Sequence, residues 1–177
     1  MWQGAFPRLQ AHTSLCYKPA MTHDIKTILK AIPLFKTLDD REIEGLSKLM
    51  AMQKFEANQP IMVEGHPPPG LYVLLEGKVA VMKGKGNAAD HICDLDAGEC
   101  IGEIEIIENA PCSASVVAYG SVNTAVIVEA NLNNFMNSQP RAAIKILRQM
   151  VVVLGERLRK SNISYSSLMT IAESVGN

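Results

Sequence analysis

The sequence predicts a mainly β protein in which short antiparallel strands are flanked by two N-terminal helices and one long C-terminal helix. Apolar residues recur at helical spacing before residue 50 and after residue 140, whereas they alternate with polar residues in between. In that central region glycine or proline interrupts the chain about every ten residues, which is typical of strands in a sandwich or barrel. A chain of 177 residues is long enough for one domain with extensions.

Two helices are predicted at the start of this arrangement. Residues 22–32 place their isoleucine and leucine side chains on one face of a helix. Thr37 then stands three residues before Asp40, and this spacing predicts a capping box that begins a second helix.

The predicted strands follow, and most of them end at a glycine. They lie within the segments 60–65, 70–77, 78–84, 91–98, 112–120 and 123–130. Pro67, Pro68 and Pro69 cannot donate to a sheet hydrogen bond, so we expect a stiff loop there.

Helical spacing returns near Pro140 and predicts a long helix that leaves the barrel. Its apolar stripe consists of Leu147, Val151, Leu154 and Leu158, continued by Tyr165, Leu168 and Ala172. A stripe of this kind favours a homodimer. The basic run at 156–160 is interpreted as a solvated helix face. The predicted parts are an extension at 1–21 that is a candidate for disorder, the β-roll with its helices at 22–138, and the long helix at 139–177.

Composition excludes several classes of function. A formal charge of -1 gives no general attraction for nucleic acid, and no apolar run approaches the roughly 20 residues of a membrane span. Residues 1–20 lack the features of a secretion signal, so the expected location is the cytoplasm. A natural start at Met21 is an alternative.

Cysteine and histidine spacing indicates no metal site. The four cysteines form no C-x-x-C pair, and the four histidines lack the short spacings of metal ligands. Each cysteine is interpreted as a small buried apolar residue in a reducing compartment.

The order of the elements, together with the segments 64–82 and 102–115, resembles the cyclic nucleotide-binding domain family. Catabolite activator proteins and the regulatory subunits of cyclic-AMP-dependent kinase belong to it, and the resemblance covers about residues 30–165. It implies a jelly roll of the double-stranded β-helix type and a regulatory role in signal transduction. The implied ligand is cyclic AMP or cyclic GMP, and no other cofactor is expected.

The family's phosphate-binding cassette reads approximately F-G-E-x-A-L, with an arginine about nine or ten residues after the glutamate. Gly102 and Glu103 match the glycine and the glutamate, which the resemblance places at the ligand. Cys112 stands where the arginine is expected, and Glu105 stands at the alanine position. Since removing one partner of a buried charged pair costs about 2 to 5 kcal/mol, cyclic nucleotide binding is expected to be weak or altered.

The remaining candidate ligand residues are polar and uncharged. Ser113 matches a small hydrogen-bonding position of the cassette, and main-chain amides together with its hydroxyl would face any anion. Ser161 and Asn162 align with positions that contact the purine edge in some members, although an exposed helix face explains them equally well. Nothing in the sequence directs Lys83 or Lys85 toward the pocket.

These observations predict a non-enzymatic sensor module whose ligand is a cyclic nucleotide or a related small molecule. The alternative is a ligand-free interaction or dimerisation scaffold. An enzyme is not expected, because the barrel region holds no cluster of metal ligands and no nucleophile with its base. A DNA-reading winged helix would have to follow the long helix, where 163–177 leave no room. One further hypothesis makes Cys112 a redox-sensitive thiolate beside helix amides.

Overall fold

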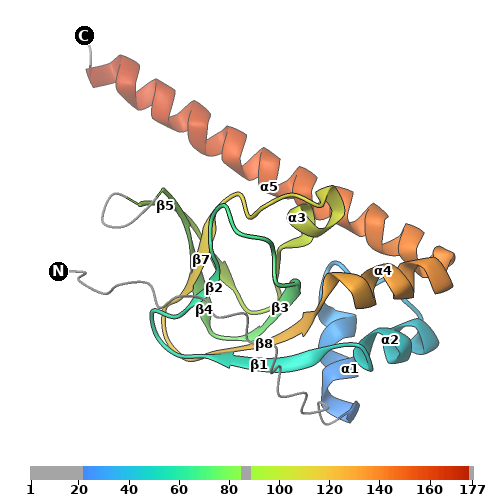
Figure 1. Cartoon of the computed structure of the whole chain (residues 1–177). Coiled ribbons are helices and arrows are strands. Elements are labelled where there is room, and N and C mark those ends of the chain that lie inside the picture. Colours follow the sequence, from blue (N-terminus) through green and yellow to red (C-terminus); the bar gives the residue numbers. More distant parts are fainter. Residues whose placement is uncertain (1–21, 85–88, 176–177) are drawn as a thin grey trace.

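The computed structural model of the chain describes residues 22–84 and 89–175, and it confirms the mainly β architecture with flanking helices (Figure 1). The predicted extension at 1–21 lies outside these residues. Two four-stranded antiparallel sheets pack together, with strand orders β1-β8-β3-β6 and β2-β7-β4-β5. The strands are β1 (Ala51–Phe55), β2 (Pro60–Met62), β3 (Leu71–Glu76), β4 (Lys78–Lys83), β5 (Asp90–Asp96), β6 (Cys100–Ile101), β7 (Ser115–Ala118) and β8 (Val122–Ile127).

Five helices complete the described part of the chain. They are α1 (Thr22–Ala31), α2 (Asp40–Ser47), α3 (Glu103–Glu108), α4 (Glu129–Ser138) and α5 (Pro140–Val175). In Figure 1, α1, α2 and α4 gather at one end of the β-roll, while α5 runs past α3 and on beyond the sheets. None of the helices in the described ranges is long and apolar enough to cross a membrane.

Strand β1, strand β6 and helix α4 are elements that the sequence patterns did not reveal. β1 buries only its two end residues, and β6 has two residues, so neither produces a clear alternation. α4 begins without a side-chain cap and buries only Leu132 and Phe135. Its helical signal is correspondingly weak.

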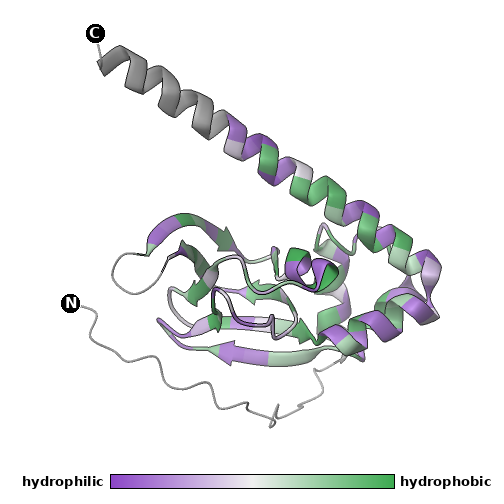
Figure 2. Ribbon diagram, turned by 45° about the horizontal axis from the view of Figure 1, so that its top comes forward, coloured by the Kyte–Doolittle hydropathy of each residue, from purple (hydrophilic) through white to green (hydrophobic). Residues whose placement is uncertain are grey.

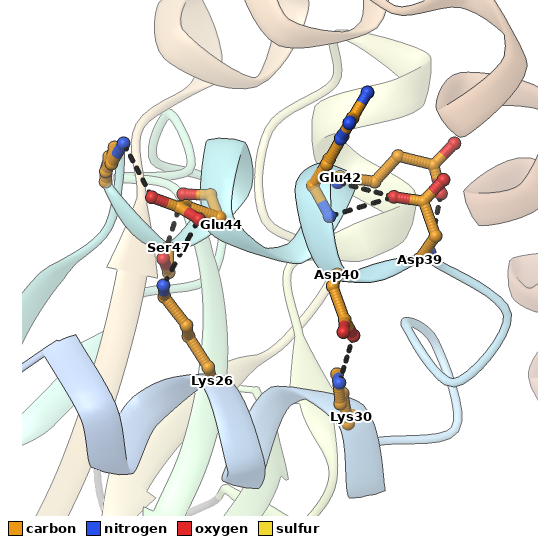
Figure 3. A network of polar contacts seen from close by, with 9 residues as sticks. Lys26, Lys30, Asp39, Asp40, Glu42, Glu44 and Ser47 are labelled. Carbon is orange, nitrogen blue, oxygen red and sulfur yellow. Dashed lines mark hydrogen bonds and ion pairs between the residues drawn. The ribbon is translucent and has the colours of Figure 1, made fainter.

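The predicted capping box is present at α2, but on a different pair of residues. Asp39 is the N-cap, its Oδ1 accepts from the amides of Arg41 and Glu42 at 2.9 Å, and Glu42 Oε2 accepts from the amide of Asp39 at 2.7 Å (Figure 3). The expected pair of Thr37 and Asp40 is therefore wrong. Asp39 has a stronger acceptor in its carboxylate, which carries charge toward the helix amides.

Two buried clusters hold the fold together. The helical cluster joins Leu29, Phe35, Leu132 and the first turns of α5, including Ile146, to one side of the sheets. The second cluster lies between the sheets. Because α5 contributes to the first cluster only as far as Met150, its later turns depend on other contacts.

Beyond its buried face α5 leaves apolar side chains exposed. Val151 is 72% exposed and Leu158 is 61% exposed, and apolar positions alternate with polar ones along the helix in Figure 2. The stripe predicted as a dimer contact is thus uncovered at these two positions. The side chains of Tyr165, Leu168 and Ala172 lie outside the described residues.

The cysteine interpretation is confirmed for two of the three described thiols. Cys100 and Cys112 are buried and unbridged, as expected. Cys93 is exposed on β5, so its prediction as a buried residue is wrong. β5 is the last strand of its sheet and exposes most of its side chains, which explains the difference.

Candidate functional site

The candidate site is built around the turn from β6 into α3. Gly102 adopts φ 85°, a left-handed conformation that favours glycine. A Cβ atom at this position would lie 2.7 Å from the carbonyl oxygen of Gly70, the residue before β3. The glycine therefore permits both the turn and the close approach of two chain segments, and it directs Glu103 inward.

Glu103 meets a cation that comes from α5. Its carboxylate is 5% exposed and forms an ion pair with Arg157, whose Nη1 donates to Oε1. The second terminal nitrogen of Arg157 donates to the carbonyl oxygen of Cys100 at 2.9 Å. Burial raises the pKa of Glu103, and the guanidinium of Arg157 opposes that rise. The interpretation of 156–160 as a solvated face is therefore wrong for Arg157.

Glu105 and Ser113 form the second polar contact of the site. Glu105 is 9% exposed, and its Oε1 accepts from the hydroxyl of Ser113 at 2.7 Å and from the amide of Ser113 at 3.2 Å. These two donors were expected to face a bound anion. The protein's own carboxylate accepts from both of them instead.

Cys112 lies between Glu105 and the loop that precedes β3. Its amide donates to the carbonyl of His66 at 2.9 Å, and its own carbonyl accepts from the amide of Gly65 at 2.8 Å. Burial, and then the charge of Glu105, raise the pKa of the thiol. Burial likewise raises the pKa of Cys100. The hypothesis of a favoured thiolate at Cys112 is therefore wrong, because the surroundings stabilise the neutral thiol.

Lys83 is another cation close to the cassette. Its Nζ donates to the carbonyl oxygen of Ser113 at 2.5 Å and lies 2.9 Å from Glu64 Oε1. The ammonium group of Lys83 is thus bound to the backbone of Ser113 and to the carboxylate of Glu64. Lys85 lies outside the described residues.

A pocket is lined by both polar contacts of the site, those of Glu103 with Arg157 and of Glu105 with Ser113. It is lined by Met62, Val81, Leu95, Cys100, Ile101, Gly102, Glu103, Ile104, Glu105, Ser113, Ala114, Val116 and Arg157. The structure thus brings together Gly102, Glu103 and Ser113, as the sequence predicted. Cys112 does not line this pocket, and neither do Ser161 and Asn162, which are exposed on α5. Contact of these two side chains with a ligand stays a prediction.

We expect Arg157→Gln to lower the free energy of unfolding by roughly 1.5–3 kcal/mol, the usual range for hydrogen bonds to charged groups. It should also raise the pKa of Glu103 further, since the cation that favours the carboxylate is removed. Because the pKa of Glu103 is raised in the folded protein, protonation of this carboxyl favours the folded state. That contribution of the protonated carboxyl is complete below the unfolded pKa and is lost as the pH rises through the folded pKa.

Urea unfolding and carboxyl NMR titration measure the two effects of Arg157→Gln. Arg159→Gln serves as the matched control, because that side chain is exposed two residues further along α5. Equal effects of the two substitutions would contradict the ion pair with Glu103.

Comparisons with known proteins match the family and the fold. The family model described as "Cyclic nucleotide-binding domain" matches residues 52–139. The structure is similar to the crystal structure of a cyclic nucleotide-binding domain from Methylobacillus flagellatus, with a TM-score of 0.69 and 26% identity. That similarity covers 77% of this chain and 81% of the other.

Kinase subunits are also similar to this chain. The regulatory subunit of a cAMP-independent protein kinase A from Trypanosoma brucei has a TM-score of 0.60 and 27% identity, over 70% of this chain and 44% of that one. The cAMP-dependent protein kinase type II regulatory subunit of Drosophila melanogaster is 28% identical over 54% of this chain. The chain spans 25% of the length of that subunit. By its matched segment and its two-sheet roll, the chain belongs to the cyclic nucleotide-binding domain family.

Proposed function

We propose that this protein is a non-enzymatic regulatory module in which a degenerate cassette binds cyclic nucleotides weakly or in an altered way. The charge of the pocket carries this proposal. Its charged lining residues are Glu103, Glu105 and Arg157, and the guanidinium is already paired with Glu103. A cyclic phosphate would therefore enter beside an uncompensated carboxylate, where the family pattern offers an arginine.

Two structures of a related kinase subunit support this interpretation. The Trypanosoma brucei subunit is described as cAMP-independent, whereas a mutant of it is bound to cAMP in the A site. That mutant replaces a glutamate by alanine, a threonine by arginine and a valine by alanine. The three replaced residues have the same relative spacing as Glu105, Cys112 and Ser113 in this chain.

The proposed mechanism of regulation is a population shift of α5. The helix contacts the pocket through Arg157, while its core packing ends near Met150. A ligand that binds better when α5 lies over the pocket shifts the protein toward that arrangement. Ligand binding would thus change the position of the part of α5 that follows Met150.

Isothermal titration calorimetry with cyclic AMP and cyclic GMP tests the proposal. Loss of a buried charge partner weakens a micromolar site by about 30- to 4,000-fold, so we expect a Kd above roughly 30 µM. A Kd near 1 µM or below for either nucleotide would show that the pocket neutralises phosphate by another route and would overturn the weak-binding proposal.

The second candidate function is a dimerisation scaffold, which the exposed apolar positions of α5 favour. We expect light scattering to give the mass of a homodimer, with Val151 and Leu158 in the contact. Leu158→Glu should then shift the mass toward a monomer. Glu156→Gln, two residues earlier and on a different face of the same helix, should leave the mass unchanged. A monomer for the unaltered chain would remove this candidate.

A further inference from the structure

The donors of Ser113, which were expected to face an anion, are taken by a side chain of the protein itself. Glu105 takes both the amide and the hydroxyl hydrogen bonds of Ser113, and its side chain is almost fully covered. Since each donor is satisfied by a charged acceptor, an incoming phosphate would have to break two charge-assisted hydrogen bonds. The carboxylate of Glu105 therefore stands in for the phosphate that the cassette would otherwise bind.

The pocket also lacks a spare cation among the residues described. Arg157 is bound to Glu103 and to the carbonyl of Cys100, and Lys83 is bound to Glu64 and to the carbonyl of Ser113. Two carboxylates and one guanidinium line the pocket, which leaves an excess of negative charge. A monoanion is repelled by this lining, whereas an uncharged ligand is not.

The hydrogen-bond acceptors and the apolar side chains of the pocket lining indicate which kind of ligand fits. Carboxylates accept hydrogen bonds from hydroxyl groups, and each has two oxygens with about four acceptor positions, of which Ser113 uses those on Oε1 of Glu105. Much of the remaining wall is apolar, with Met62, Val81, Leu95, Ile101 and Val116. Acceptors next to an apolar wall suit a molecule that carries sugar hydroxyls on one side and a flat, weakly polar ring on the other.

We propose that the pocket takes an uncharged nucleoside in preference to a cyclic nucleotide, with Glu103 and Glu105 accepting hydrogen bonds from the ribose hydroxyls. This inference rests on the proposed function, because it assumes that the cassette pocket is the ligand site. Glu105 is then a specificity-determining residue that selects against the phosphate group.

Calorimetry with adenosine and cyclic AMP on the full chain tests the inference, because the two probes share their base and ribose and differ at the phosphate. We expect adenosine to bind at least 10-fold more tightly than cyclic AMP. Glu105→Ala should weaken adenosine binding at least 10-fold. Glu108→Ala is the matched control, since this exposed carboxylate lies on the same helix outside the pocket, and it should leave both affinities unchanged.

Glu105→Gln separates charge from shape, because it keeps an acceptor oxygen without the negative charge. Glu105→Gln should keep the Kd for adenosine within a few-fold of the unaltered value. It should also reduce the ratio of the Kd for cyclic AMP to the Kd for adenosine. Circular dichroism of each variant establishes that it is folded.

The outcomes distinguish this inference from the proposed function. Tighter binding of cyclic AMP than of adenosine overturns the inference. A third outcome is that the unaltered chain binds neither probe, while Cys112→Arg combined with Glu105→Ala binds cyclic AMP. The pocket is then the ligand site, and the inferred preference for a nucleoside is wrong. If no variant binds either probe, both proposals fall and the scaffold function remains.

Discussion

Gly102→Ala is expected to lower the free energy of unfolding by about 2–5 kcal/mol and to disrupt the pocket. The left-handed conformation at φ 85° costs a residue with a side chain about 1–2 kcal/mol. The new methyl group would also lie 2.7 Å from the carbonyl oxygen of Gly70, and relief of such overpacking commonly costs about 1–3 kcal/mol. Since that oxygen belongs to the backbone, the turn itself has to shift.

Urea unfolding of Gly102→Ala measures the cost, and Gly98→Ala provides the matched control. Gly98 has φ 96°, but a Cβ atom there meets nothing within 4 Å. It should therefore show only the conformational cost of about 1–2 kcal/mol. Equal destabilisation by the two substitutions would show that the approach of Gly70 to Gly102 contributes nothing.

The second large effect is a gain of affinity for cyclic AMP in Glu105→Ala combined with Cys112→Arg. Under the proposed function, arginine at 112 supplies a cation for the phosphate, and removal of Glu105 frees the amide and hydroxyl of Ser113. One charged pair is worth about 2–5 kcal/mol, so the Kd should fall by about 30- to 4,000-fold. Calorimetry on the double variant and on the unaltered chain gives the ratio directly.

The two substitutions are expected to depend on each other. Glu105 is close enough to Cys112 to raise the pKa of its thiol, so an arginine placed at 112 alone would pair with Glu105. Cys112→Arg by itself should therefore gain much less affinity than the double variant. Cys112 is buried in the inter-sheet cluster, and circular dichroism of both variants is needed to show that the fold survives. Additive effects of the two substitutions would contradict their coupling.

Local sequence patterns predicted most of the fold because they report directly on backbone periodicity. The strands β3 and β4 alternate or run apolar between glycines, and each was found within its predicted segment. β6 and α4 were not predicted, because a strand of two residues or a helix with two buried side chains produces hardly any hydrophobic pattern. The capping box was placed two residues early, since Thr37 and Asp39 both precede helical spacing.

The candidate site was predicted in part, from the resemblance to the family. The resemblance placed Gly102, Glu103 and Ser113 in one short cassette, and all three line the same pocket. Arg157 was missed because it lies 54 residues from Glu103 and sits in a basic run that is ordinary for an exposed helix. Its place one turn before Ser161, on the helix expected to cover the ligand, was the available signal.

By itself the sequence predicted the mainly β fold class, and its resemblance to the family placed a candidate cassette at Gly102 and Glu103, with Cys112 at the position where the family has its arginine. The fold class depends on residues that are neighbours in the chain, where spacing translates into geometry. Only the tertiary structure decided how the charges are used: Glu105 holds the donors of Ser113, and Arg157 neutralises Glu103. Such pairings arise when α5 packs beside α3 and the sheets close, because burial then requires each charged group to find a partner from a distant segment.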